Sequence, residues 1–269
     1  DGRSTNFTLD GANLNNHFGL TSKLPGGGNP ISMDAIDEVQ VVVSPYDVRQ
    51  TNFIGGGINA VTKSGTNTFK GSAYIYYNNE NMHGNRVDDA DLGERGKNRT
   101  TTYGFTLGGP IVKDKLFFFV SGEYYDFSYP NVYYPLDGAD NPYASKTLGA
   151  DVYYNNQNLG NVFNATMAQA MIDHYEKTYG VANTGESFTQ HQKKSRSING
   201  MARIDWNINS SNKFMFRYQI ADSYSDQYGS GISTYYFNGS SYKQVNKTHT
   251  FVGELNSRIS ENVSNKLRA

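Results

Sequence analysis

The chain has 269 residues, a formal net charge of −1 and no cysteine. The balanced charge gives no reason to propose nucleic-acid binding, which calls for a clustered basic surface, and the lack of cysteine excludes disulfides and thiolate metal sites. No run of about 18 apolar residues occurs, which excludes a transmembrane helix. Membrane strands are not excluded, because their alternation hides the lipid-facing side chains from averaged hydropathy.

The first part of the chain predicts a compact β-rich unit. A strand with a turn is expected at Phe7–Gly11, and a short helical turn at Pro30–Asp37. The β-branched run Val39–Val43 predicts a buried strand, and a second short strand is expected at Ile58–Thr62. A polar turn at Lys63–Asn67 follows.

Three consecutive glycines, Gly55, Gly56 and Gly57, stand between these two strands. Glycine adopts positive φ at little steric cost, so the triplet predicts a hinge. No Gly-Lys-Ser or Gly-Lys-Thr follows the triplet, so it does not indicate a phosphate-binding loop.

From Phe69 onward the sequence predicts amphipathic strands, because apolar and polar residues alternate. The clearest has Ile198, Ile204 and Trp206 on one face, and Asn199 and Arg203 on the other. The six predicted strands are Phe69–Asn78, Thr101–Gly109, Leu116–Tyr129, Ser195–Asn209, Lys213–Asp222 and Lys247–Ile259. These lengths match or exceed the roughly 9–11 residues that a tilted membrane strand needs.

The connections between these strands alternate in length. Those at 78–100, 130–194 and 223–246 are long, whereas those at 109–115, 210–212 and 261–265 are tight. Alternating polarity alone does not separate a membrane barrel from a soluble sandwich, but alternating loop length is typical of barrels, whose external loops are the longer ones. We therefore predict an all-β chain that contains part of an antiparallel transmembrane β-barrel, with the long connections outside the cell.

The longest connection has helical composition near 163–179. Met167, Met171, Ile172 and Tyr175 recur at helical spacing, and Gly180 follows as a stop. We expect a short helix in this outer loop, which either packs on the loops or gates a substrate.

Two stretches, Gly57–Gly65 and Phe69–Gly71, resemble the junction of plug and barrel in TonB-dependent outer-membrane receptors. Asn29–Val41, Tyr46–Gln50 and Leu107–Phe119 are similar to the Oar-like branch of Bacteroidota. The resemblance implies that residues 1–66 are the C-terminal part of a plug domain and that 67–269 are the first strands of a barrel of about 22 strands. Neither end of the chain looks natural, so we expect an internal fragment.

The resemblance also implies a function in the bacterial outer membrane. Such receptors import a ligand, which is bound by the outer loops and the plug apex, and the TonB complex pulls on the plug through a segment that lies before residue 1. The expected partners are therefore TonB, outer-membrane lipid and an imported peptide, glycan or metal chelate. Since Ser44-Pro45-Tyr46 stands where many siderophore receptors carry Arg-Gly-Pro, a siderophore is not implied.

We expect neither an enzyme nor a cofactor. The five histidines are scattered and show no metal-ligand spacing. An acidic cluster is interpreted as a solvated loop in preference to a Ca²⁺ site; its members are Asp88, Asp89, Asp91 and Glu94.

Candidate binding residues lie in the long loop and at the expected contact between plug and wall. Exposed aromatic residues form platforms for sugars or peptides, although packing within the loop explains them equally well. The five candidates are Tyr133, Tyr134, Tyr143, Tyr153 and Tyr154. Arg49 on the plug and Glu123 on the polar face of a strand are a candidate ion pair.

Two other functions fit the pattern. The first is an outer-membrane barrel used for adhesion or surface interaction, which loop deletion would separate from a transporter. The second is a secreted β-sandwich that serves as a binding module.

Overall fold

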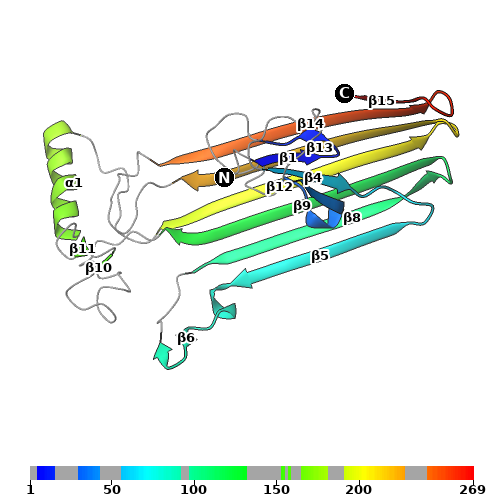
Figure 1. Cartoon of the computed structure of the whole chain (residues 1–269). Coiled ribbons are helices and arrows are strands. Elements are labelled where there is room, and N and C mark those ends of the chain that lie inside the picture. Colours follow the sequence, from blue (N-terminus) through cyan, green and yellow to red (C-terminus); the bar gives the residue numbers. More distant parts are fainter. Residues whose placement is uncertain are drawn as a thin grey trace.

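The computed structural model describes residues 5–15, 30–42, 56–91, 97–131, 153–154, 157–158, 165–180, 191–227 and 241–269. In this part of the chain a seven-stranded sheet, here called the large sheet, and a four-stranded sheet, the small sheet, account for most of the secondary structure (Figure 1). The strands are almost all antiparallel to their neighbours. The large sheet arises from the alternating segments of the sequence, and the small sheet from the short strands that precede them.

The large sheet is a meander whose spatial order follows the chain. Its strands are β5 (Lys70–Asn79), β8 (Arg99–Val112), β9 (Leu116–Asn131), β12 (His191–Asn207), β13 (Asn212–Gln227), β14 (Tyr242–Arg258) and β15 (Ser264–Arg268). The six predicted strands are confirmed, and β15 is a seventh. The strands β8, β9, β12, β13 and β14 run 14 to 17 residues, so most extend beyond the predicted segments.

The small sheet has the order β2-β1-β4-β3. It consists of β1 (Thr5–Leu9), β2 (Ala12–Asn13), β3 (Ile36–Val42) and β4 (Gly56–Thr62), with the 3₁₀ turn η2 (Met33–Ala35) before β3. The central pair, β1 and β4, is parallel. The predicted strands near the start and at 58–62, and the helical turn, are confirmed.

One prediction for the small sheet is wrong, and the glycine hinge stays a prediction. The predicted buried strand is an edge strand, β3, in which Val39 and Val41 are 50% and 64% exposed. Gly56 and Gly57 do not form a loop with positive φ; they lie in β4 and pair with Thr5 and Asn6 of β1. A β-branched run predicts a strand but not which neighbours cover it. Gly55 lies outside the described residues.

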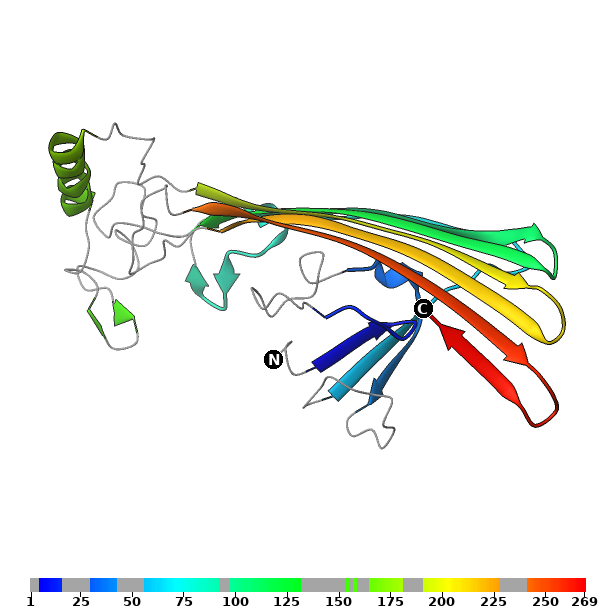
Figure 2. The same ribbon diagram turned by 90° about the horizontal axis from the view of Figure 1, so that it is seen from above.

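The small sheet packs on one face of the large sheet, here called the inner face (Figure 2). Leu9, Ala35 and Ala60 of the small sheet and its turn form a buried apolar cluster with Phe119 of β9 and Met201 of β12. Apolar contacts between the sheets are therefore concentrated on two residues of the inner face.

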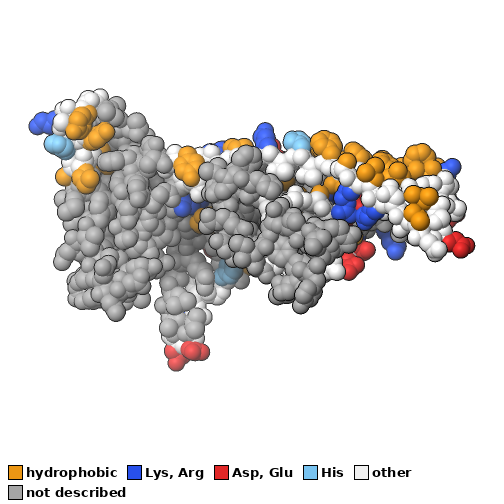
Figure 3. Space-filling view, turned by 45° about the horizontal axis from the view of Figure 1, so that its top comes forward, with side chains coloured by type: hydrophobic (Ala, Val, Ile, Leu, Met, Phe, Trp, Pro, Cys, Tyr) orange, Lys and Arg blue, Asp and Glu red, His pale blue; other side chains and the backbone are white. Residues whose placement is uncertain are grey.

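The polarity of the large sheet is the reverse of that in a soluble protein. Arg217, Gln219 and Glu254 on the inner face are buried, at 0%, 2% and 7% exposure, whereas Ile198 and Phe251 on the opposite, outer face are 48% and 64% exposed. Figure 3 shows hydrophobic side chains gathered over the end of the sheet that carries the short turns. The alternation predicted from the sequence is confirmed, and a soluble sandwich would have buried its apolar face instead.

The short and the long connections lie at opposite ends of the large sheet, as their alternating lengths predicted. Short turns join the strands at one end, and the long connections, with α1 (Ala165–Tyr179), lie at the other (Figure 1). α1 ends at Tyr179 and is followed by Gly180, which has φ +63° and whose N–H donates to Glu176 O at 2.9 Å, so the predicted helix and its stop are confirmed. The smaller elements are η3 (Glu80–Met82), β6 (Arg86–Val87), β7 (Ala90–Asp91), β10 (Tyr153–Tyr154) and β11 (Gln157–Asn158). Among the helices that the structure describes, none is long and apolar enough to cross a membrane.

Candidate functional site between the two sheets

Asp10 occupies the tight turn that follows β1. Its φ is +48° and that of Gly11 is +76°, a left-handed pair that aspartate and glycine tolerate best. The Asp10 carboxylate is buried and accepts hydrogen bonds from the Thr62 N–H at 2.9 Å and the Thr62 hydroxyl at 2.8 Å. One side chain thus joins the ends of the two central strands of the small sheet.

Two arginines of the large sheet reach the same carboxylate from the inner face. Arg203 of β12 and Arg217 of β13 lie directly opposite each other in the strand register. Arg217 Nε lies 3.2 Å from Asp10 Oδ2, and Arg203 Nη1 lies 3.7 Å from Asp10 Oδ1. Arg203 also makes a two-pronged contact with Asp205 at 2.8 and 2.9 Å. We call Asp10, Thr62, Arg203, Asp205 and Arg217 the docking cluster.

Inner-face side chains of the large sheet also bind backbone carbonyls of the small sheet and of the segment that precedes η2. Arg217 donates to Leu9 O at 3.0 Å, and Arg203 donates to Thr62 O at 2.9 Å. Gln219 donates to Pro30 O at 2.8 Å. Because these contacts use carbonyl groups, they fix the position of the small sheet whatever the side chains of its strands.

The charges of the docking cluster balance, with two arginines against two aspartates. A buried charge is tolerated only when it is paired and hydrogen-bonded, and loss of one partner is strongly destabilising. The cluster therefore holds the small sheet in one position.

A second contact between the sheets centres on the Tyr74 hydroxyl of β5. It lies 2.6 Å from Ser32 Oγ and donates to Glu123 Oε2 at 2.6 Å. The Tyr74 ring lies over Gly104 of β8, where an added Cβ would come within 2.0 Å of Tyr74 Cζ. Nearby, the Ser72 hydroxyl donates to Asp34 at 3.3 Å.

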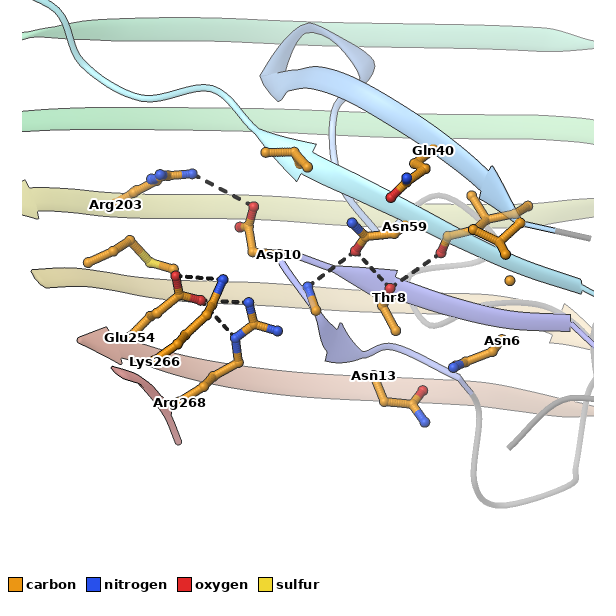
Figure 4. A pocket seen from close by; sticks show the side chains of 16 residues that line it. Asn6, Thr8, Asp10, Asn13, Gln40, Asn59, Arg203, Glu254, Lys266 and Arg268 are labelled. Atoms are coloured by element: carbon orange, nitrogen blue, oxygen red, sulfur yellow. Dashed lines mark hydrogen bonds and ion pairs between the residues drawn. The ribbon is translucent and has the colours of Figure 1, made fainter. Parts of the chain in front are cut away.

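A cavity of about 650 Å³ lies beside the docking cluster, between β1, β4 and the strands β13 to β15 (Figure 4). Glu254 lines it and pairs with Lys266 at 3.0 Å and with Arg268 at 2.6 Å. Thr8 and Asn59 of the small sheet, joined by a 2.8 Å hydrogen bond, line the opposite side. The charged groups around this cavity are paired with one another, an arrangement that suits the binding of polar groups and the positioning of the two sheets.

The structure places only some of the predicted site residues. Glu123 lies on the inner face as predicted, and its hydrogen-bond donor is Tyr74. Its proposed partner Arg49 lies outside the described residues. So do Glu94, Gly55, Tyr133, Tyr134 and Tyr143. The backbone of Tyr153 and Tyr154 forms β10, which pairs with β11, and residues 88 and 89 form the turn between β6 and β7.

The docking cluster was not predicted as a site. The alternation assigned Arg203 to the polar face of its strand, but it did not indicate which part of that face meets the small sheet. The turn at Asp10 was predicted without its charge partners. A pair of arginines at one level of adjacent polar faces is the signal that could have indicated an acidic partner.

Comparisons with known proteins agree with this architecture. The family described as outer membrane beta barrel domain matches residues 61–269. The TonB-dependent transporter Oar of Myxococcus xanthus is 34% identical over 119 residues, which cover 42% of this chain and 11% of that protein.

Two solved structures share the fold. A mutant of the ferric enterobactin receptor PfeA of Pseudomonas aeruginosa has a TM-score of 0.57 at 13% identity, and covers 99% of this chain with 32% of its own length. The outer membrane transporter YddB of Escherichia coli has a TM-score of 0.56 at 12% identity, over 96% of this chain and 30% of its own. The chain thus spans about a third of each structure. The relatives named here are transporters and receptors, not enzymes.

Proposed function

Because the chain belongs to the family of outer membrane β-barrel domains, and is thereby located in the outer membrane, we propose that it forms part of a TonB-dependent transporter that imports a ligand. In this proposal residues 1–66 are the C-terminal part of the plug domain and 67–269 are the first strands of the barrel. The outer face of the large sheet contacts lipid, and the inner face lines the lumen. The sequence stretches Asn29–Val41 and Leu107–Phe119 support an Oar-like protein of Bacteroidota.

The observation that carries the proposal is the docking cluster. A plug must stay closed at rest and yet move when it is pulled. Hydrogen bonds and ion pairs meet this demand, because water can replace each partner as the surfaces separate, so that the net free energy per hydrogen bond is small. The apolar contribution of the wall to this contact is concentrated on Phe119 and Met201.

The ligand would enter from the side of the long connections. The tyrosines Tyr133, Tyr134, Tyr143, Tyr153 and Tyr154 are the proposed binding platform, and Gly55 to Gly57 the proposed point of bending in the plug. Peptides, glycans and metal chelates are the ligand classes to be compared. The TonB complex is the proposed partner that supplies the pull.

Uptake by the full-length protein tests the proposal. A labelled peptide mixture, a glycan mixture and a ferric chelate would be offered to cells that express the protein, with and without functional TonB. We expect one class to accumulate only when both the protein and TonB are present. Equal accumulation of every class without TonB would refute TonB-dependent import and favour adhesion.

A matched variant separates transport from simple leakage. Asp10→Asn weakens the docking cluster, so passive entry of a large antibiotic through the barrel is expected to rise while TonB-dependent uptake falls. Substitution of the exposed Lys113 by Gln, in the short turn between β8 and β9, is the control and leaves both unchanged.

A further inference from the structure

Charged residues on the outer face begin within three successive outward-facing rows of the strand register: Asp222 pairs with Lys247 in the first row, Asp126 with Arg196 in the second, and Asp226 with Lys243 in the third. On the side of the large sheet nearest the long connections, the apolar residues of β8, β9, β12, β13 and β14 give way to ionisable ones. We call this set the boundary band; it comprises Arg99, Asp126, Lys194, Arg196, Asp222, Asp226, Lys243 and Lys247. According to the strand register, each of these residues lies on the same outer face of the sheet as Ile198 or Phe251.

The distance from the boundary band to the other end of the apolar belt matches the thickness of the apolar part of a membrane. On β12, Arg196 stands ten residues from Trp206, which closes the apolar stretch at the other end. That separation is about 33 Å of extended chain at about 3.3 Å per residue. At a strand tilt of about 40° it gives a height of about 25 Å, the thickness of the apolar band of an outer-membrane barrel.

Cations dominate the exposed part of the boundary band. Its five basic residues are exposed, whereas its three aspartates are half-buried. Asp126 is shared by Arg99 at 3.2 Å and Arg196 at 3.6 Å, and Asp222 pairs with Lys247 at 3.5 Å. The acidic groups therefore lie beneath the basic ones, and the surface offered to the membrane boundary is positive.

Two of the cations are held by one aromatic ring. The Arg196 guanidinium lies 5.5 Å from the centres of both Tyr124 and Tyr224, and Lys243 Nζ lies 4.0 Å from the centre of Tyr224. Cation–π contacts orient a cation without neutralising it. Within the described part of the chain, Lys243 makes no ion pair, so its charge remains available. Figure 3 shows basic side chains on the same rim as the hydrophobic patch, on the side toward the long connections.

We propose, resting on the membrane barrel of the proposed function, that the boundary band, centred on Arg196, Tyr224 and Lys243, binds the phosphate groups of an anionic lipid in the leaflet next to the long connections. Arginine offers a planar fork that matches phosphate, lysine adds a point charge, and the neighbouring apolar belt contacts the acyl chains. Charge complementarity selects this occupant, because the five basic residues outnumber the three aspartates of the band, and a neutral headgroup would leave this excess positive charge without a counter-charge.

The test measures lipid binding by the full-length protein purified in neutral detergent. The probes are purified lipid A, a glycolipid that carries phosphate groups, and the same lipid after enzymatic removal of its phosphates. We expect the phosphorylated form to bind the protein more tightly. For the double variant Arg196→Gln, Lys243→Gln we expect binding about 30-fold weaker, since each basic residue near a charged membrane surface contributes about fivefold.

A control of equal charge loss lies at the other end of the same sheet. The exposed pair Lys113 and Lys115 belongs to the short turn between β8 and β9, and Lys113→Gln, Lys115→Gln should change lipid binding less than twofold. The charge-preserving pair Arg196→Lys, Lys243→Arg should retain most of the binding. A slower-migrating band after boiling in SDS would verify that each variant has folded.

Two results would overturn the proposal: equal binding of the phosphorylated and dephosphorylated lipids, or equal losses in the two glutamine variants. Should the Arg196 and Lys243 variant fail to fold, the salt dependence of the unaltered protein decides the matter. Affinity that falls with rising NaCl supports phosphate recognition, and affinity independent of salt contradicts it.

Discussion

The Asp10 carboxylate connects three parts of the molecule at one point. It accepts hydrogen bonds from Thr62 at the end of β4, while its own turn ends β1, and it lies within 3.7 Å of arginines from two wall strands. Arg217 is fully buried, so it depends on nearby protein groups for its counter-charge. The position of the small sheet is thus sensitive to the charge of a single residue.

Neutralising Asp10 should release the small sheet more easily. In Asp10→Asn the shape is kept but the two arginines lose a counter-charge, and breaking a buried pair costs about 3 kcal/mol. We expect the urea concentration at which residues 5–62 become sensitive to protease to fall accordingly. Asp34→Asn is the control, because its 3.3 Å contact with Ser72 contributes about 1 kcal/mol or less. Similar shifts for the two variants would contradict the role of the cluster.

Tyr74 and Gly104 should behave as one unit. Tyr74→Phe removes the hydroxyl that contacts Ser32 and Glu123, which we expect to cost about 2 kcal/mol because one of its partners is a carboxylate. Gly104→Ala places a methyl group where the Tyr74 ring lies, so it should cost a similar amount by displacing that ring. In a Tyr74→Ala background, Gly104→Ala should then have little further effect. Additive losses in this double-mutant cycle would show that the two positions act separately.

Among the elements, the segment from β4 to β5 passes very close to the large sheet. A Cβ on Gly65 would meet Phe118 O at 2.3 Å and Gly109 O at 2.7 Å, both backbone atoms. Two residues later, Asn67 exchanges hydrogen bonds with Asp114, in the β8–β9 turn, at 2.5 and 2.8 Å. The small sheet is therefore covalently joined to β5 through a segment that is itself fixed to β8 and β9.

Gly65→Ala tests this close approach. Backbone atoms have little freedom to yield, so we expect a cost of about 1–3 kcal/mol and a lower yield of heat-modifiable protein in the outer membrane. Gly84→Ala is a suitable control, since nothing lies within 4 Å of its added Cβ. An equal yield from both variants would show that the segment can move away from the wall.

For the whole molecule, the decisive property is the reversal of polarity across the large sheet. In the proposed barrel, lipid solvates apolar side chains such as that of Phe251, which is 64% exposed and would promote aggregation of the protein in water. The free-energy cost of replacing such a side chain by a charged one therefore depends on its depth in the membrane and not on packing with neighbouring side chains. This distinguishes the outer face from any ordinary surface.

Phe251→Lys and Val245→Lys compare two depths on one face of β14. Val245 is 53% exposed and lies between two lysines of the boundary band, whereas Phe251 lies in the apolar belt. A lysine at mid-depth costs about 2–4 kcal/mol and one near the boundary about 0–1 kcal/mol. We expect Phe251→Lys to reduce the midpoint of urea unfolding in lipid vesicles and Val245→Lys to leave it nearly unchanged. Two equal effects would argue against a lipid-facing belt.

The sequence separation of the interacting residues explains how much of the fold and of the docking cluster could be predicted from the sequence. Strand alternation is local, so the faces of Ile198 and Arg203 were predictable from their neighbours. The contacts of the docking cluster join residues 141 and 208 positions apart, such as Arg203 with Thr62 and Arg217 with Leu9, and no local pattern encodes such pairs. The exposure of β3 was mispredicted for the same reason, because its place at the sheet edge depends on distant partners.

The parallel pairing of β1 with β4 has a mechanical consequence. Five consecutive residues of β1 pair with Gly56–Ala60, and β4 continues to Thr62, which the wall grips through Arg203. A pull on Thr5, with Thr62 held, loads these hydrogen bonds in shear, so that they share the force and do not peel apart one by one. Tension from the start of the chain would therefore reach the grip at Arg203 and Arg217 before the small sheet itself came apart, and the sheet would leave the wall as an intact body.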